Sequence, residues 1–438
     1  MQRLLFKQID NSALVVFRII FGLLCFLESV GAILTGWVQR VMIAPKFTFS
    51  FIGFEWLQPL PGQWMYIYYM IMGVFGLGIM LGYKYRLSIF SFTLMWSAVY
   101  LMQKSAYNNH YYLLMIFSML MVFLPAHHYA SIDAAQNSNI KKGYMPQWCK
   151  WLIISLLFII YTYAALAKFY PDWLNFTFIK NLMATRAHFP VIGQVLQQHW
   201  VHVFLTYGGI LFDGLVIPLL IFRPTRKFAF LAALFFHLFN SIVLHIGIFP
   251  YLALAFSLFF FDSEKIQSIF LRSKVYYNKA EVIIPKQAKP ISLMLAMFLS
   301  INITLPLRHH YFIDDVLWTE EGHRLSWRMM LRSKRGVATY KVYDKKTKET
   351  TTVKLSDFLT PKQQQGVTTK PDMIWQFAQY LKQHYAELGK EDVAVYVDCF
   401  VSVNGRPSKR LINPNVDLAS KDWSHLKHSS WVLPSAGH

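Results

Sequence analysis

Nine apolar runs follow one another along the first 307 residues, separated by short polar loops. A run of about 20 apolar residues has the length of an α-helix that crosses a bilayer. Backbone groups inside a bilayer must be satisfied internally, so such runs form helices rather than open sheets. We therefore expect a polytopic α-helical membrane protein with about nine membrane helices. The runs cover residues 12–36, 64–83, 87–102, 111–126, 148–167, 201–222, 228–249, 250–261 and 290–307.

The composition excludes two other classes of protein. Hydrophobic residues make up 55% of the chain and charged residues only 15%, which is too apolar for a soluble globule of 438 residues. A net charge of +20 is also found in nucleic-acid-binding proteins, but here the basic residues are spread through the short loops. That distribution favours anionic lipid and a topology signal, so we expect no nucleic-acid partner.

The basic loops predict the orientation, because lysine and arginine collect on the cytoplasmic side of a membrane. With the N-terminus inside, the basic loops alternate correctly at every crossing. Residues 108–110, Lys168 and residues 169–200 then lie outside, together with everything after Arg308. The short run 250–261 is the weakest span, and its loss would invert whatever follows it. The inside loops hold Arg3 and Lys7, Lys84 and Arg86, Lys141 and Lys142, Arg223 to Lys227, and Lys265 to Lys289.

The chain divides into two domains where the last apolar run ends. Residues 1–307 are expected to form a helical transmembrane domain, and residues 308–438 a soluble extracytoplasmic domain of α+β or β-rich class. The run Val393–Val403 has the period of a β-strand and precedes a turn signal, Asn404-Gly405. We also expect a hairpin over Val337–Tyr343 and Thr350–Leu355, an amphipathic helix over Asp372–Leu388, and a loop over 362–370.

One lysine ends the apolar run that begins near Trp151. Lys168 follows Tyr161 by two helical turns and precedes Pro171-Asp-Trp173. A lysine in this position usually extends its ammonium group to the lipid headgroups. The aromatic residues on both sides favour instead a packed pocket, where a desolvated amine can act as a base. Both interpretations of Lys168 stay open on these grounds.

Several polar side chains interrupt the apolar runs, and each requires a partner or a ligand. His237 and Asn240 share one helix face, which fits a hydrogen-bonded seam as well as a binding site. Asp213 is expected to pair with a cation or a hydroxyl group across the bundle, and Arg18 and Glu28 invite the same interpretation. The clustered spacings of a histidine-box metal site are absent from the sequence, so we expect no metal.

A resemblance is carried by Lys104-Ser-Ala-Tyr-Asn-Asn-His110-Tyr-Tyr-Leu. The segment is similar to the Trp/Tyr-Asn-Asn-His-x-Tyr-Leu segment of the vitamin K-dependent γ-glutamyl carboxylase family. The resemblance covers nearly the whole chain, and its ordered segments are more specific together than any one alone. The other matching segments are Ser12 to Arg18, Leu60 to Tyr66, His128 to Asp133, Lys168 with Pro171-Asp-Trp173, Gly208 to Asp213, Phe236-His237 with Asn240, Ser326 to Met330 and Val401 to Asn404.

The resemblance implies an enzyme that oxidises vitamin K hydroquinone with O2 to the epoxide. This reaction removes a γ-proton from a peptide glutamate, to which CO2 adds. Lys168 is implied as the base, with His110 and Asn109 orienting the hydroquinone and stabilising its anion. The expected partners are membrane lipid, an isoprenoid quinone and a glutamate-containing peptide or protein. We expect further quinone contacts from Tyr161, Asn108, His237, Asn240 and Met330, and glutamate contacts from Arg186, His309, His323, Arg332, Lys334 and Arg406.

Three departures from the animal enzymes make epoxidation better supported than carboxylation. The chain ends at His438, whereas the animal enzymes continue with a further lumenal region. The stretch Glu320 to Arg324 differs from the animal pattern, where a Leu-Tyr pair contributes to glutamate recognition. Phe49 and Tyr380 stand where cysteines link the two halves of the animal enzyme. The short form resembles bacterial members of the family, which indicates a bacterial inner membrane.

Two other classes of function stay open. One is a non-catalytic membrane protein that keeps the scaffold and binds quinone or a protein partner. The other is a transporter with a polar site at the membrane midplane, but the sequence shows neither internal repeats nor paired broken helices. Conversion of the hydroquinone to the epoxide by the purified protein in air would distinguish the enzyme from both.

Overall fold

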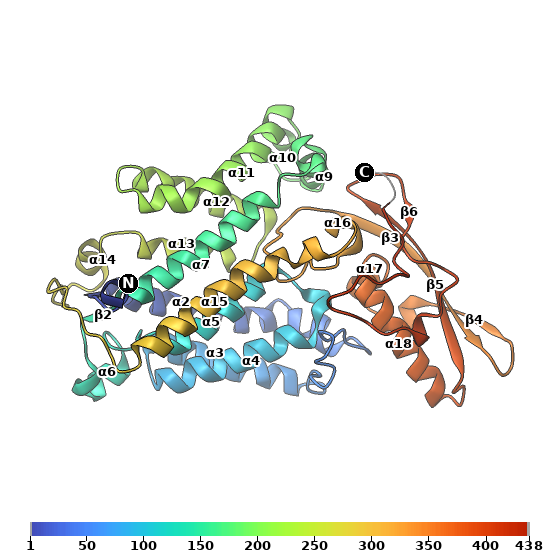
Figure 1. Ribbon diagram of the computed structural model, residues 1–438, viewed down its shortest axis with the longest axis horizontal. Coiled ribbons are helices and arrows are strands. Elements are labelled where there is room, and N and C mark those ends of the chain that lie inside the picture. Colours follow the sequence, from blue (N-terminus) through green and yellow to red (C-terminus); the bar gives the residue numbers. More distant parts are fainter. Residues whose placement is uncertain (1, 436–438) are drawn as a thin grey trace.

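The computed structural model describes residues 2–435. Long helices form a bundle, and the C-terminal part forms a sheet with two helices packed against it (Figure 1). Helix α15, Ala288–Leu307, runs along the bundle and leads towards the C-terminal part (Figure 1). One hydrophobic core lies within the bundle and a second one within the C-terminal part. A third, smaller core around Trp173 and Leu331 joins the two parts.

Six helices are long and apolar enough to cross a membrane, by length and composition. They account for most of the predicted spans, and the described residues therefore form a polytopic helical membrane protein. The six are α2 (Ser12–Leu34), α3 (Trp64–Leu81), α7 (Gln147–Leu166), α11 (His199–Ile221), α12 (Arg226–Leu244) and α15 together with the turn that extends it to Tyr311.

The predicted count of nine is not supported. Each of the three remaining apolar runs does form a helix: α4 (Tyr85–Met102), α5 (Asn109–Phe123) and α13 (Phe249–Phe256). However, α4 carries Arg86 and several hydroxyl side chains, which lower its hydropathy. Helix α5 and the helical segment Phe249–Phe259 are each shorter than 18 residues. At about 1.5 Å per residue, the helical part of each is shorter than a hydrocarbon core of about 30 Å, so neither is a candidate span by length.

Helices α2 and α3 pack with their backbones almost in contact. A Cβ atom added to Gly22 would lie 2.2 Å from the backbone nitrogen of Met80, and one added to Gly76 would lie 2.7 Å from that of Phe26. Only glycine fits at these two points, as in other closely packed membrane helices. The buried Arg18 of α2 donates to the backbone oxygen of Ala130 at 2.7 Å, so its charge is used to hold the loop after α5.

Short elements connect the long helices. The strands β1 (Gln8–Asp10) and β2 (Tyr144–Pro146) pair antiparallel near the N-terminus. The short helices are α1 (Gln2–Leu5), α6 (Ile132–Gln136), α8 (Pro171–Leu174), α9 (Thr177–Ala184), α10 (Ile192–Leu196), α14 (Ser263–Phe270) and α16 (Val316–Thr319).

The C-terminal part contains an antiparallel sheet of order β4-β3-β5-β6. The predicted hairpin is confirmed, with Tyr340 opposite Val353, and so is the strand Val393–Val403. Alternate residues of that strand are buried against α18, which confirms the amphipathic helix. The strands are β3 (Lys334–Asp344), β4 (Thr350–Val353), β5 (Val393–Val403) and β6 (Lys409–Arg410), and α18 covers Pro371–Glu387.

The loop expected over 362–370 is wrong for most of its length, because Pro361–Val367 forms helix α17. Pro361 occupies the first turn, where proline is well tolerated. Thr360 and Gln363 form a capping box, which satisfies backbone amides at the helix start. The glutamine-rich composition obscured a helix whose start signal is present in the sequence.

A loop between α2 and α3 inserts aromatic rings into the C-terminal core. Phe49 is fully buried there, and the ring of Phe47 stacks on that of Tyr380 with centroids 4.3 Å apart. The side chain of Gln363 also donates to the backbone oxygen of Phe47 at 2.6 Å. The rings of Phe47 and Phe49 also contact each other, with centroids 4.8 Å apart, so packing joins this loop to the C-terminal core.

Candidate functional site

An apolar cavity of about 790 Å³ lies among α7, α11 and α12, with residues of α9 and α10 on its wall. Aromatic and aliphatic side chains form most of the lining, and only a few polar groups reach it. Its size and lining suit an isoprenoid quinone ring with part of its tail. We call it the apolar cavity. The residues predicted from the sequence that line it are His110, Tyr161, Lys168, His237, Asn240 and Met330.

Lys168 lies just beyond the end of α7, with only 6% of its surface exposed. Its Nζ atom forms an ion pair with the buried carboxylate of Asp213 on α11. Nζ also donates to the backbone oxygen of Ala164 at 3.0 Å and lies 5.3 Å from the centre of the Trp173 ring. The amine is therefore held on the cavity wall rather than extended to lipid headgroups, and Asp213 has the cationic partner expected from the sequence.

A second polar pair lies in the same cavity. The hydroxyl group of Tyr161 and Nε2 of His237 are 3.1 Å apart, which joins α7 to α12. Both side chains line the apolar cavity, as does Asn240, one helical turn beyond His237. The polar face of α12 thus forms a hydrogen-bonded contact, as one of the two alternatives predicted, and it also lines a cavity, while its role in binding stays a prediction.

The start of α5 is fixed by its two asparagines in different ways. Oδ1 of Asn108 accepts from the backbone amide of Tyr111 at 2.7 Å, so Asn108 is the N-cap. Nδ2 of Asn109 donates to the backbone oxygen of Arg328 at 3.1 Å, and its Oδ1 accepts from the Tyr107 hydroxyl group at 2.8 Å. Asn109 therefore ties the bundle to the segment that contains Arg328.

His110 lies between two cavities. Its ring packs against that of Phe249, with centroids 4.1 Å apart. Within residues 2–435 no hydrogen-bond partner of its imidazole is found, so both ring nitrogens can serve a ligand. The ring lines the apolar cavity and also a second, polar space of about 240 Å³. Met329 and Met330 line both spaces as well.

The second space, which we call the polar chamber, is strongly basic. It lies where the start of α5 meets residues 320–332 and the start of α18. Arg328 and Lys370 form no ion pair within the described part of the chain, and Nε of Arg328 is buried without a partner. Such groups suit a carboxylate ligand. The lining consists of Tyr107, Asn108, Asn109, His110, Glu320, His323, Arg324, Arg328, Met329, Met330, Arg332 and Lys370.

One carboxylate already occupies part of this chamber. Nε of Arg332 donates to Glu320 at 2.6 Å, and Lys334 lies 3.4 Å from the same carboxylate. Burial alone would raise the pKa of Glu320, but Arg332 and Lys334 hold it well below its usual range. Burial and Arg332 lower the pKa of His323 well below its usual range, so that imidazole is neutral. Burial, followed by Arg324, lowers the pKa of Lys370 to about 8.

The segment between Glu320 and Met330 has an unusual backbone. Glu320, Leu325, Trp327 and Met330 all have positive φ, between 50° and 63°. Side chains other than glycine adopt this conformation only when the surroundings impose it, and such residues concentrate at functional sites. Gly322 is also left-handed, and a Cβ atom there would lie 2.7 Å from Cα of His309. The chamber wall is therefore a strained, tightly specified loop.

The remaining predicted glutamate contacts are placed differently. His309 lies beside the chamber, with Nε2 3.4 Å from Nη1 of Arg328. Lys334 pairs with Glu320 and is not among the residues that line the chamber. Arg406 forms an ion pair with Asp172 at 2.6 Å and joins the C-terminal part to α8. Arg186 lies near the ring of Phe189 and does not line the chamber.

The sequence did not point to three basic residues of the chamber. Arg328 lies inside the matched segment Ser326 to Met330, but Met330 is the only residue of that segment that the sequence predicts as a site residue. Arg324 forms an ion pair with Asp372 at 2.6 Å, and Lys370 precedes α18. Nothing in the local pattern distinguishes these two from ordinary surface residues. Within the described residues no group of three or more histidine, cysteine, aspartate or glutamate side chains is placed to hold a metal ion.

Comparison with known families assigns both parts of the chain. The HTTM domain matches residues 6–264, and the lumenal domain of vitamin K-dependent gamma-carboxylase matches residues 287–438. No solved structure matches the chain. The apolar helices and the lumenal-domain match together describe a multi-pass membrane protein with an extracytoplasmic C-terminal domain.

Proposed function

The chain belongs to the vitamin K-dependent gamma-carboxylase family, and from this premise we propose that it is a vitamin K hydroquinone epoxidase and gamma-glutamyl carboxylase. In the first half-reaction the hydroquinone and O2 give the epoxide and water. In the second, a peptide glutamate and CO2 give γ-carboxyglutamate and a proton. The hydroquinone, once bound, supplies the reducing equivalents for O2.

The observation that carries the proposal is the pair of adjoining spaces that share His110, Met329 and Met330. The apolar cavity suits a lipid-soluble quinone, and the polar chamber suits a carboxylate from water. A base generated on one side of this shared wall lies within reach of a γ-methylene group on the other side. Coupling of the two half-reactions requires this proximity, because a γ-proton is too weakly acidic for any side-chain base.

In this proposal the Lys168 ammonium first passes a proton to the Asp213 carboxylate, because two opposite charges in apolar surroundings gain little over the neutral pair. The neutral amine then accepts a proton at Nζ from the hydroquinone. His110 donates a hydrogen bond to the hydroquinone oxygen from the opposite wall. Asn109 acts through Arg328, whose backbone it holds. Tyr161, His237 and Asn240 orient the ring within the cavity.

In the polar chamber, Arg328 and Lys370 would bind the substrate glutamate. Arg332 is less available, since Glu320 already accepts its hydrogen bonds. A substrate carboxylate must compete with this internal one, which makes epoxidation the better supported half of the reaction. Arg186 and Arg406 would contact a peptide only beyond the chamber.

The test is the conversion of vitamin K hydroquinone to its epoxide by the purified protein in lipid nanodiscs under air. Incorporation of labelled CO2 into a glutamate peptide is measured in the same samples. Epoxide formation that requires Lys168 supports the proposal, and label in the peptide extends it to carboxylation. Quinone binding without epoxide would favour a non-catalytic quinone-binding protein instead.

We further propose that the N-terminus is cytoplasmic and that the membrane is a bacterial inner membrane. The support is the alternation of basic loops, among them Lys84 with Arg86 and Lys141 with Lys142. This alternation requires α4, α5 and α13, each with its flanking residues, to complete crossings in addition to the six long helices. Fusions at His438 to alkaline phosphatase and to a fluorescent protein measure the orientation. Active phosphatase is expected, whereas an inactive phosphatase with a fluorescent partner fusion would reverse the assignment.

A further inference from the structure

Glu28 is a carboxylate within a membrane-spanning helix, and the mechanism above does not use it. It lies in α2, six residues before the helix ends at Leu34. Ionisable residues in such positions are costly and usually mark a site or a proton path. Glu28 borders two further cavities, of about 570 Å³ and about 20 Å³.

The larger of these cavities leads to the reaction centre. It lies among α2, the start of α5 and residues 245–249. Its wall includes His110 and Asn108, which also line the polar chamber. His110 is therefore approached from three sides, by the apolar cavity, by the polar chamber and by the cavity of Glu28. The polar groups of this third space are Glu28, Thr35, Asn108, His110, Tyr111 and His245.

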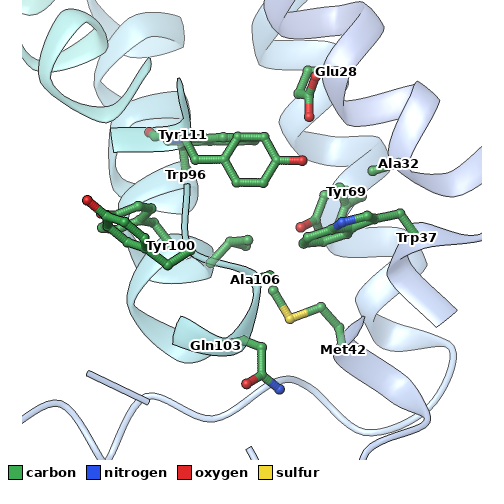
Figure 2. Close-up of a pocket in the computed structure, with 12 residues that line it drawn as sticks. Glu28, Ala32, Trp37, Met42, Tyr69, Trp96, Tyr100, Gln103, Ala106 and Tyr111 are labelled. Atoms are coloured by element: carbon green, nitrogen blue, oxygen red, sulfur yellow. The ribbon is translucent and has the colours of Figure 1, made fainter. Parts of the chain in front are cut away.

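The smaller cavity supplies an independent sign of water. Figure 2 shows Glu28 and Tyr111 on its wall together with Tyr69 and Tyr100. The hydroxyl groups of Tyr69 and Tyr100 are buried, and neither has a hydrogen-bond partner within the described residues. A buried hydroxyl group without a partner costs about 1–3 kcal/mol. The cavity volume of about 20 Å³ is sufficient for one water molecule, which would supply the missing bonds.

The groups that face Glu28 favour proton transfer over a fixed ion pair. Tyr111 lines both cavities together with Glu28 and brings a hydroxyl group to them. Tyr69 on α3 and Cys25 on α2 are its other titratable neighbours, and both are uncharged when protonated. His110 and His245 face it across the larger cavity. None of the described lysine or arginine residues forms an ion pair with Glu28, so the carboxyl group is free to change its charge.

We propose that Glu28 is the proton acceptor of a hydrated route that serves His110 through this third cavity. The role of this route rests on the proposed function, because carboxylation releases one proton for every CO2 added: R–CH2–COO⁻ + CO2 → R–CH(COO⁻)2 + H⁺. The proton that Lys168 takes from the hydroquinone passes to the His110 imidazole, which lines the same apolar cavity, and then through water to the Glu28 carboxylate, which becomes a carboxylic acid. It then leaves to bulk water near Thr35, where α2 ends. Along this route only bonds to hydrogen are made or broken.

The first arm of the test needs no quinone. Infrared spectra of the protein in nanodiscs are recorded over a range of pH and after transfer to D2O. We expect a carboxylic acid band that disappears in Glu28→Gln and shifts in Tyr111→Phe. In D2O this band should move to its deuterated position within seconds. Glu264→Gln, which changes a glutamate of α14 outside the long helices, is the matched control and leaves the band in place. A Glu28 band that fails to exchange, or that is absent at every pH, overturns the inference.

The second arm measures carboxylation of a glutamate peptide, because epoxidation alone releases no net proton. Glu28→Gln keeps the shape of the side chain but cannot accept a proton, so turnover is expected to fall at least about tenfold with unchanged KM for the hydroquinone. The solvent isotope effect should rise, and Glu28→Asp should restore part of the rate. Turnover of Glu28→Gln at the wild-type rate overturns the inference. If the wild-type protein carboxylates no peptide, the carboxylase part of the proposed function fails, and the exchange arm alone decides whether the hydrated route exists.

Discussion

The apolar cavity and the polar chamber share a wall but are built by different means. The cavity is formed mainly by long helices, and four of its polar side chains are arranged in two pairs, Lys168 with Asp213 and Tyr161 with His237. The chamber is formed by a strained loop and helix starts, and it holds basic groups in excess of carboxylates. A cavity for a neutral lipid-soluble molecule needs balanced polar groups, whereas a chamber for an anion needs uncompensated positive charge.

The largest expected effect on activity comes from a substitution in the apolar cavity. Lys168→Ala is expected to lower epoxidation about 10³-fold, because it removes the proton acceptor. A small soluble amine should restore part of the activity, increasingly as rising pH frees the amine. Lys150→Ala, which changes a lysine in the first turn of α7, is the matched control. Epoxidation at the wild-type rate in Lys168→Ala would mean that the lysine is only a structural ion-pair partner.

The next largest effect on activity is expected for a substitution of His110, in the wall that the two spaces share. His110→Ala is expected to lower the turnover number for epoxidation about 10²-fold with little change in KM, because its hydrogen bond strengthens as charge develops. Asn108→Ala at the same helix start is expected to cost about 1 kcal/mol in the free energy of unfolding and little activity, because it removes only the N-cap. Equal small losses in both variants would show that this segment is purely structural.

On the chamber side, Arg328→Gln is expected to raise KM for a glutamate peptide about tenfold, since one charge-assisted hydrogen bond is lost. Epoxidation without peptide should fall far less than in His110→Ala. The comparison variant is Arg406→Gln, whose side chain pairs with Asp172 outside the chamber. A larger rise in KM for Arg406→Gln than for Arg328→Gln would move the peptide site away from the chamber.

The smallest effect is a pH dependence of peptide binding. Lys370 has a pKa of about 8 because burial and Arg324 disfavour its charge. Its positive charge is present below that pH and is lost as the pH rises through it. KM for the glutamate peptide should therefore increase between pH 7 and 9, by roughly fivefold for a half-buried charge pair. In Lys370→Met this increase should disappear, which steady-state kinetics at several pH values would show.

The same contrast explains what the sequence could predict. A charged or polar residue within an apolar run stands out, so Lys168, Asp213 and His237 were identified before their contacts were known. Arg324 and Lys370 belong to polar stretches in which a basic residue is unremarkable, and only the fold brings them beside His110. Arg186 was assigned to glutamate binding from the same kind of stretch, and the fold places it outside the chamber.

The secondary structure was likewise predicted better where the apolar pattern is clear than in polar stretches. The nine apolar runs all became helices, but only six of these helices are candidate spans, because α4 is more polar and α5 and the segment Phe249–Phe259 are shorter than 18 residues. In the C-terminal part the period-2 pattern predicted β5 to the residue. The helix α17 was missed because glutamine and threonine are common in loops, and its capping box was not used as a signal.

The insertion of Phe47 and Phe49 into the C-terminal core has a consequence for biogenesis. The backbone oxygen of Phe47 accepts from Gln363, 316 residues further along the chain. Contacts so distant in sequence form late, since a ribosome must first release the whole intervening chain. The rings of Phe47 and Phe49 therefore stay unburied until the later membrane helices have been inserted. The final core closes only when the last strand has been translocated, so truncation at any point after α2 leaves an exposed aromatic surface for chaperones or proteases to recognise.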